Sequence, residues 1–369
     1  MTPVRHLYFH IPFCPKLCPY CSFFVETGAK NKNTAFIEAL LADLRRACGE
    51  YDIRPKTIYF GGGTPSALLE SQLDLLLSGL RKTLDFSDVE EFSLEANPAT
   101  VKPSKARLLQ AHGVTRISLG VQSWDDALLK TLGRVHTAAT AEKTYETLRE
   151  AGIPAVNLDL MFSVPGQTES QWHTTLAKTI ALAPNHISTY CLTYEEDTEY
   201  FRKLTGGTFV QNIELDAQLF EHTMDTLASA GFAQYEISNH ARPGCESRHN
   251  RAYWLGADYL GFGPGAFSTV GENRWETIRD TAEYTRRAHA GESTAHFRET
   301  LTAAQRVGEI AAFRIRMSEG IPRTELAPWA DKIAEFETIG LLETHGDNLR
   351  LTRRGKLLAD SVAEIFVGG

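Results

Sequence analysis

The chain has no long hydrophobic run and no long basic run. A helix that spans a bilayer needs about 20 apolar residues in a row, and no segment approaches that length. The 38 basic and 46 acidic side chains give a net charge of −8, which argues against a nucleic-acid binder. Hydrophobic residues make up 43% of the 369 positions, as in soluble globular proteins. The N-terminus shows no cationic and apolar leader, so we expect a cytoplasmic protein.

Cysteine is also scarce, and its spacing excludes most common uses of thiols. Six cysteines in the whole chain are too few for a disulfide framework, and Cys14, Cys18 and Cys21 lie too close together to join distant segments. No second C-x2-C pair follows to complete a zinc site with four ligands. Ser22 stands where covalent c-type haem requires His. A dithiol redox pair of Cys18 and Cys21 stays open but leaves Cys14 without a role.

The C-x3-C-x2-C spacing of the three cysteines is suited to a cubane iron–sulfur cluster. One loop can place three thiolates on three irons, and the fourth iron then stays open for a chelating ligand. Free thiols of this kind fit a reducing compartment, which agrees with a cytoplasmic location.

Short apolar runs alternate with amphipathic stretches up to about residue 265. The predicted strands are 7–11, 57–60, 91–95, 116–121, 156–162 and 186–192, and the predicted helices are 34–48, 66–84, 104–112, 140–151, 169–182 and 214–230. Six strand–helix units in series predict an α/β fold with parallel strands and right-handed crossovers, in an open sheet or a barrel.

Unusual residues follow directly after these strands. The cysteine loop follows the first strand, a run of three glycines follows the second, and Glu95, Gln122 and Asp159 end or follow later ones. The carboxyl ends of parallel strands meet at one edge of the sheet, so we expect these groups to surround one site. Polar groups are costly to bury without partners, which favours a site over a plain core.

The pattern changes near residue 300. Two predicted helices, 303–317 and 323–339, precede a predicted hairpin of strands 340–344 and 349–352, and a helix over 353–366 closes the chain. This order predicts a small winged-helix-like α+β domain. We therefore expect a barrel domain over 1–270, a linker over 271–299 and a C-terminal domain over 300–369.

The cysteine triplet, the glycine run and the serial strand–helix units together resemble the radical S-adenosylmethionine (SAM) family. The segments 8–14, 95–98 and 120–123 narrow the resemblance to the oxygen-independent coproporphyrinogen III oxidase group. The resemblance implies a partial TIM-type (β/α)6 barrel, a [4Fe–4S] cluster on the three cysteines, and SAM on the open iron. Implied contacts to that SAM come from Tyr8, Gly62 and Glu95. Positions around a second SAM in the oxidase are matched by Tyr20, Gly63, Thr64, Gln122, Arg134 and Asp159.

Two features point away from the oxidase and toward the haem chaperone branch of that group. Phe23 stands where the oxidase has a fourth cysteine, and His249, Tyr253 and Trp254 match the H-N-x-x-Y-W signature of the chaperone branch. The resemblance implies that His249 is an axial ligand of haem iron, with Tyr253 and Trp254 against the porphyrin. His10 and His136 are alternative ligands.

The implied function is that of a haem chaperone without oxidase activity. Its implied partners are haem, haem-acceptor proteins such as membrane respiratory enzymes, an electron donor for the cluster, and a second copy of the chain. The alternative is a radical enzyme that decarboxylates coproporphyrinogen III to protoporphyrinogen IX, because the cluster and SAM residues are shared with the oxidase.

Overall fold

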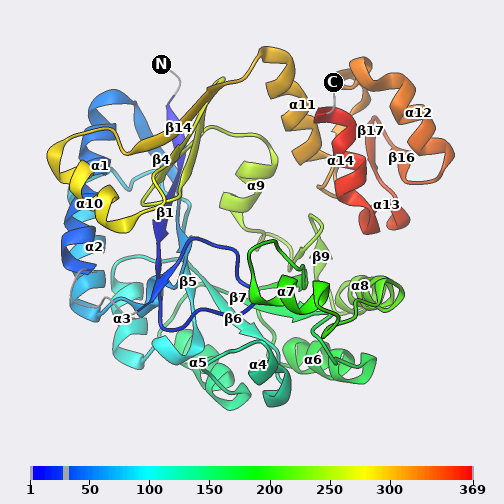
Figure 1. The fold of residues 1–369 in the computed structure, drawn as a ribbon, viewed down its shortest axis with the longest axis horizontal. Coiled ribbons are helices and arrows are strands. Elements are labelled where there is room, and N and C mark those ends of the chain that lie inside the picture. Colours follow the sequence, from blue (N-terminus) through cyan, green and yellow to red (C-terminus); the bar gives the residue numbers. More distant parts are fainter. Residues whose placement is uncertain (1–2, 28–32, 368–369) are drawn as a thin grey trace.

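A twelve-stranded, mostly parallel sheet forms the centre of the protein. The computed structural model describes residues 3–27 and 33–367, so that residues 1–2, 28–32 and 368–369 of the predicted domains lie outside it. Within the described residues the strands follow the order β14-β13-β12-β11-β1-β4-β5-β6-β7-β8-β10-β9 (Figure 1).

The six predicted strands lie side by side in the order in which they follow along the chain, and neighbours run parallel. They are β1 (Val4–Ile11), β4 (Ile53–Gly62), β5 (Glu91–Ala96), β6 (Arg116–Gln122), β7 (Ala155–Phe162) and β8 (His186–Cys191). The helices predicted between them are α1 (Asn33–Glu50), α2 (Glu70–Thr83), α3 (Pro103–Ala111), α5 (Ala138–Glu150), α6 (Glu169–Ala181) and α8 (Ile213–Ser229). The α/β fold class is confirmed.

The two faces of the parallel strands differ in chemistry. Leu7, Phe9 and Ile11 of β1 are fully buried and belong to one core cluster with side chains of the surrounding helices. The ring of Phe9 stacks between Phe60 and Phe262, with centroids 4.9 and 5.0 Å away. The alternate residues of the same strands face the inside of the barrel and are mostly polar. The apolar core therefore lies outside the sheet, and the polar groups gather inside it.

The sheet is longer at both edges than the sequence analysis predicts. A seventh parallel strand, β11 (Tyr259–Phe262), pairs with β1. Beyond it run the antiparallel strands β12 (Phe267–Val270), β13 (Asn273–Thr277) and β14 (Ala295–Thr300). Beyond β8 run β10 (Asn239–Ala241) and β9 (Ala233–Gln234). Short helices α4 (Asp126–Thr131), α7 (Glu199–Thr205) and α9 (Arg248–Trp254) complete this part.

The segment 271–299, expected to be a linker, instead carries β13, helix α10 (Thr281–Ala290) and most of β14. Helix α10 packs on α1, and the hydroxyl of the fully buried Tyr284 donates to Asp43 over 2.8 Å. The segment is polar in composition, and its few buried aromatic side chains are what attach it to the barrel. The boundaries of the domains stay a prediction.

The last part of the chain forms a small α+β unit with its own core. It comprises α11 (Ala303–Arg314), β15 (Ile321–Pro322), α12 (Ala330–Thr338), β16 (Leu342–His345), β17 (Asn348–Leu351), α13 (Arg353–Leu357) and α14 (Ala359–Val367). The predicted hairpin is β16–β17. The predicted helix over 323–339 starts as two short 3-10 turns, and the predicted closing helix is interrupted at Leu358. The amide of Ser318 donates to the carbonyl of Tyr235 over 3.0 Å, which ties this unit to the barrel.

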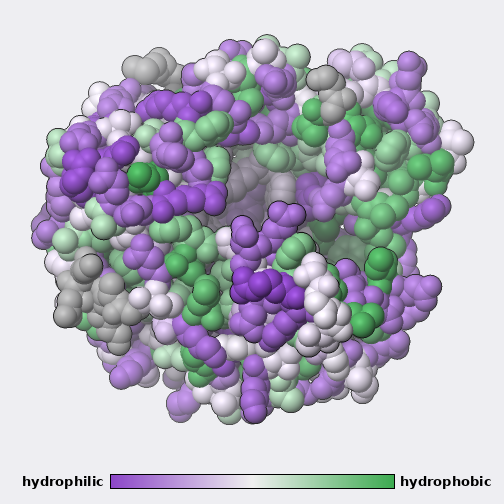
Figure 2. Space-filling model, viewed as in Figure 1, coloured by the Kyte–Doolittle hydropathy of each residue, from purple (hydrophilic) through white to green (hydrophobic). Residues whose placement is uncertain are grey.

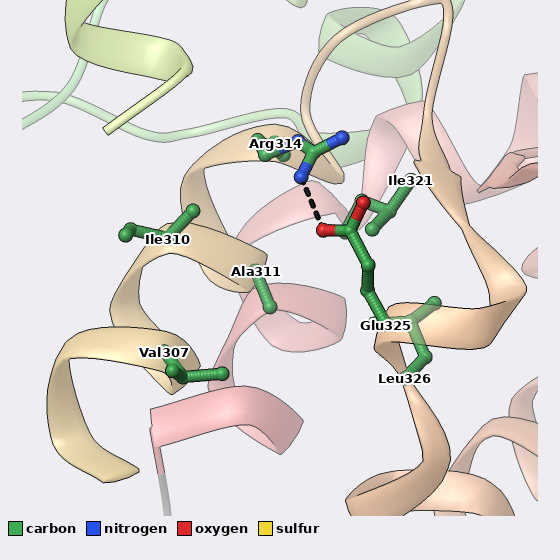
Figure 3. Close-up of a pocket in the computed structure, with 7 residues that line it drawn as sticks. All are labelled: Val307, Ile310, Ala311, Arg314, Ile321, Glu325 and Leu326. Carbon is green, nitrogen blue, oxygen red and sulfur yellow. Dashed lines mark hydrogen bonds and ion pairs between the residues drawn. The ribbon is translucent and has the colours of Figure 1, made fainter. Parts of the chain in front are cut away.

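A small depression lies on this C-terminal unit between α11 and the segment after β15 (Figure 3). Its walls are apolar, and an ion pair between Arg314 and Glu325 lies at its edge. Its volume of about 170 Å³ is below the range of roughly 300–1,000 Å³ that ligand pockets usually have, so we place no porphyrin there. Among the described residues, no helix is long and apolar enough to cross a bilayer.

Candidate functional site

The cysteine loop lies against the glycine turn at the carboxyl ends of β1 and β4. Backbone amides of Gly63 and Thr64 donate to the carbonyls of Ile11 and Phe13, each over 2.9 Å. This contact brings the Thr64 hydroxyl within 3.4 Å of the Cys14 sulfur. The first cysteine therefore faces the glycine turn, as the sequence analysis expects.

The three thiols of the loop are free and partly exposed. Burial raises the pKa of both Cys14 and Cys21, so binding of a metal, which needs thiolates, must release their protons. Among the described residues, no three His, Cys, Asp or Glu side chains converge as ligands of a single ion. A cubane cluster does not need that arrangement, because each thiolate binds a different iron.

Arg134 follows α4 in the chain, and its guanidinium contacts the same cysteine loop. Its Nη1 lies 3.6 Å from the sulfur of Cys18, and its Nη2 donates to the carbonyl of Gly120 over 3.0 Å. Tyr20 lies beside the guanidinium, and burial raises the pKa of its phenol. The guanidinium therefore places a fixed positive charge beside the cysteine loop.

Gln122 combines an unusual backbone conformation with an unpartnered side-chain oxygen. Its backbone has a φ of 66°, in the left-handed region that residues other than glycine rarely adopt. Its Oε1 is buried and has no hydrogen-bond partner among the described residues. Both observations fit a polar ligand at the end of β6.

Two carboxyl groups lie inside the barrel near its carboxyl end. Glu95 accepts hydrogen bonds from the Tyr59 hydroxyl over 2.7 Å and from the Gly62 amide over 3.2 Å. Burial, opposed by the Tyr59 hydrogen bond, raises the pKa of Glu95 to about 7. Asp159 accepts from the Ser118 hydroxyl over 3.0 Å, and burial raises its pKa as well. Such a pair can bind a cation without a full local excess of negative charge.

The glycine run packs closely against other parts of the protein. Gly62 has a φ of +100°, and a Cβ there would lie 2.4 Å from the imidazole of His10. A Cβ on Gly63 would lie 2.8 Å from the carbonyl oxygen of Ile11. The resemblance implies that Gly62 and Gly63 contact SAM, and within the protein each also lies against atoms that leave no room for a Cβ. His10 is held in turn by Tyr8, whose hydroxyl lies 3.0 Å from its Nδ1.

Helix α9, which carries the histidine signature, is anchored at the amino ends of β5 and β6. The carboxylate of Glu91 accepts from the backbone amides of Arg248 and His249, both over 3.1 Å, and so caps the helix. Arg116 donates to Glu91 over 2.8 Å and to the carbonyl of Cys245 over 2.7 Å. The cap and the ion pair fix α9 against the inner face of the barrel.

His249 is buried with one ring nitrogen free. Its side chain is 1% exposed, its ring stacks on Tyr59 with centroids 5.0 Å apart, and Tyr253 meets it edge-on at 4.6 Å. Its Nδ1 lies 2.7 Å from the Thr57 hydroxyl, whereas its Nε2 has no partner among the described residues. Burial lowers the pKa of His249 to about 3, so the ring is neutral at pH 7.

The other residues proposed for haem are placed differently. Trp254 packs against Phe313 at 6.1 Å and under the guanidinium of Arg316 at 5.1 Å, so it faces the C-terminal unit. His10 bonds through both ring nitrogens, to Tyr8 and to a backbone carbonyl. His136 bonds through Nε2 to the carbonyl of Val121 over 3.1 Å, and its buried Nδ1, like Nε2 of His249, has no partner among the described residues. Only Tyr253 shares the surroundings of His249.

Figure 2 shows a hollow in the middle of one face of the molecule. In the same view, Figure 1 places α9 at this hollow, with α7 below it and the C-terminal unit to one side. The helix that carries His249 therefore borders a concave part of the surface.

Besides Glu95 and Asp159, the barrel interior holds polar residues that the sequence does not single out. They include His6, Thr57, Glu91, Arg116 and His186. The signal was present as an alternation of polar and apolar residues within parallel strands, which usually read as continuous apolar runs.

Comparisons with known proteins agree with this architecture. Residues 8–178 match the radical SAM superfamily, and residues 301–358 match the HemN C-terminal domain. The chain is 32% identical to a Bacillus subtilis protein named heme chaperone HemW, over 99% of this chain and 100% of that protein. It is 35% identical to the protein of that name from Mycobacterium tuberculosis, over 98% and 94%.

A solved structure shows the same fold. The coproporphyrinogen III oxidase HemN of Escherichia coli, described as a radical SAM enzyme, superposes with a TM-score of 0.85 at 21% identity, over 99% of this chain and 90% of that one. At that identity the match shows the fold alone. With relatives above 30% identity along nearly the whole of both chains, the chain belongs to the radical SAM superfamily, whose members use a [4Fe–4S] cluster and SAM, and within it to the HemW family.

Proposed function

We propose that this chain binds haem and transfers it to acceptor proteins, with a [4Fe–4S] cluster and SAM at the opposite end of the barrel. The observation that carries the proposal is His249, a neutral and buried imidazole whose Nε2 has no partner among the described residues. The names of the HemW relatives support haem as the ligand. Neutral imidazole nitrogen is a common ligand of haem iron.

The cluster end supports the same proposal through the residues that gather there. Cys14, Cys18 and Cys21 would hold the cluster, and Arg134 would balance part of its negative charge. When bound, the cluster supplies one electron at a time. The unpartnered Oε1 of Gln122 and the carboxyl of Glu95 would bind polar groups of SAM.

The HemW relatives favour the chaperone over the oxidase, and so does Phe23. This side chain is 69% exposed and stands in the place of the fourth cysteine of the oxidase. We therefore expect no protoporphyrinogen IX from the cluster-loaded protein when it is given coproporphyrinogen III, SAM and a reductant without oxygen. Product formation would favour the oxidase instead.

Haem titration of the anaerobically reconstituted protein tests the proposal. We expect binding by the wild type, and a loss of affinity and a changed Soret band in His249→Ala. His240→Ala is the matched control, because His240 is also fully buried, with a pKa lowered to about 3 and both ring nitrogens unpartnered among the described residues. Equal haem affinity in His249→Ala and wild type would remove His249 as the ligand. No binding by the wild type would end the proposal. Titrations with and without SAM show whether the two ends influence each other.

A further inference from the structure

One hydroxyl bridges two imidazoles inside the barrel. The Oγ1 of Thr57 on β4 lies 2.9 Å from Nδ1 of His6 on β1 and 2.7 Å from Nδ1 of His249 on α9. Thr57 is 2% exposed and His249 is 1% exposed, so little water competes for these contacts. His6 is only partly buried.

The number of protons limits how these three groups can bond. A threonine hydroxyl has one proton, and a neutral imidazole has one protonated and one bare nitrogen. The single Thr57 hydroxyl lies within hydrogen-bond distance of the Nδ1 atoms of both His6 and His249. Thr57 therefore donates to one imidazole and accepts from the other. If both rings donated to it, its own proton would have neither ring as an acceptor.

The two remaining arrangements differ at Nε2 of His249. If Thr57 donates to His249, that ring carries its proton on Nε2, where the N–H is buried without an acceptor. If His249 donates to Thr57, Nε2 is a bare lone pair, and Thr57 donates to His6. Orphaned buried N–H groups are rarer in proteins than acceptors with a free lone pair, which favours the second arrangement.

We propose that Thr57, backed by His6, is a positioning residue that holds His249 in the Nδ1–H tautomer and leaves its Nε2 lone pair free for an iron ligand. The inference rests on the proposed function, because it concerns how His249 is prepared for haem. Hydrogen bonds to the second nitrogen of a ligating histidine fix its tautomer and orientation in other metal sites.

Nuclear magnetic resonance of haem-free, cluster-reconstituted protein tests the tautomer directly. With ¹⁵N-labelled histidine, and with the His249 signals assigned through His249→Ala, we expect the proton of His249 on Nδ1. In Thr57→Val, which replaces the hydroxyl by a methyl group, we expect the proton to move to Nε2 in part or in full. A wild-type His249 protonated on Nε2 overturns the proposal.

Haem titration of matched variants tests the consequence. We expect Thr57→Val to lower haem affinity roughly 10- to 100-fold, the usual effect of removing such a supporting hydrogen bond. Thr57→Ser keeps the hydroxyl and should restore both tautomer and affinity. Thr189→Val is the control, because the hydroxyl of Thr189 is also buried but has no partner among the described residues, and it should bind like wild type.

The outcomes separate this inference from the function on which it rests. If His249→Ala loses haem but Thr57→Val keeps wild-type affinity, the positioning role of Thr57 is refuted and His249 remains the haem ligand. If His249→Ala keeps haem, His249 is not the haem ligand, whichever tautomer it adopts. If Thr57→Val does not fold, the wild-type spectrum and Thr57→Ser decide, and a Thr57→Ser protein with altered tautomer or affinity counts against the proposal.

Discussion

Replacement of Glu91 by alanine should destabilise the protein strongly and release helix α9. The carboxylate accepts from Nε of Arg116 over 2.8 Å, from the amides of Arg248 and His249 over 3.1 Å, and from the hydroxyl of Ser247 over 3.3 Å. The side chains of the Glu91–Arg116 pair are 5% and 7% exposed. Removal of one partner leaves a buried guanidinium without its counter-charge, which costs about 3–5 kcal/mol. The lost cap on α9 is part of that cost.

The neighbouring glutamate provides the control. Glu90 pairs with Lys56 over 2.9 Å and with Arg248 over 2.5 Å, but its side chain is 38% exposed. An exposed pair contributes about 0–1 kcal/mol, so Glu90→Ala should have little effect. Denaturant unfolding followed by fluorescence gives both free energies. In the double variant Glu91→Ala/Arg116→Ala, the two losses should not add, because the uncompensated charge is gone. A Glu91→Ala protein as stable as Glu90→Ala would refute the reasoning.

Three further predictions concern the cluster end. Gly62→Ala should lose the cluster and the fold, because its Cβ would lie 2.4 Å from the His10 imidazole at a φ of +100°. Gly166→Ala, with a φ of +80° and open space around it, should cost only backbone strain of about 1–3 kcal/mol. Iron content and denaturant unfolding of the two variants measure the difference. The pKa of Glu95 in the folded protein is about 7, above its ordinary value of 4.5. Its contribution to the free energy of unfolding is therefore fully present below pH 4.5 and is lost as the pH rises to about 7. Unfolding of the cluster-free protein between pH 5 and pH 8 should show this loss in the wild type and not in Glu95→Gln. Cys14→Ser should reduce bound iron and sulfide after reconstitution, and Cys48→Ser on α1 should not; equal iron in both would contradict the ligand assignment.

The parallel strands could be predicted from sequence because each is a short apolar run followed by an amphipathic helix. Their parallel direction is confirmed, and the structure adds that they lie in sequence order. Strand β11 (Tyr259–Phe262) was missed because it is short, contains Gly261 and precedes a glycine-rich turn, all of which weaken a strand signal. The strands after it were missed because polar residues dominate a segment that is held by a few buried aromatic side chains.

The site was predictable in part for a similar reason. Residues just after parallel strands meet at one edge, so local sequence indicates that Cys14 and Thr64 lie together, and their side chains are in contact. The spacing of four places His249 and Tyr253 on one face of a helix, and their rings do meet. The contact of His249 with Thr57 joins residues 192 positions apart, and no local pattern could indicate it. The outward packing of Trp254 depends on the C-terminal unit and could not be predicted from the motif.

The two ends of the barrel share one side chain. The hydroxyl of Tyr59 donates to Glu95 at the carboxyl end, and its ring stacks on His249 toward the amino end. Strand β4 sets this arrangement, because Thr57, Tyr59 and Gly61 alternate along its inner face and each contacts one layer of the interior. A ligand that draws the proton or the oxygen of Glu95 toward itself changes the hydrogen bond of Tyr59, and a ligand on His249 changes the surface on which the Tyr59 ring rests. The polar inner face of the sheet therefore supplies a direct physical contact between the proposed cluster end and the proposed haem ligand.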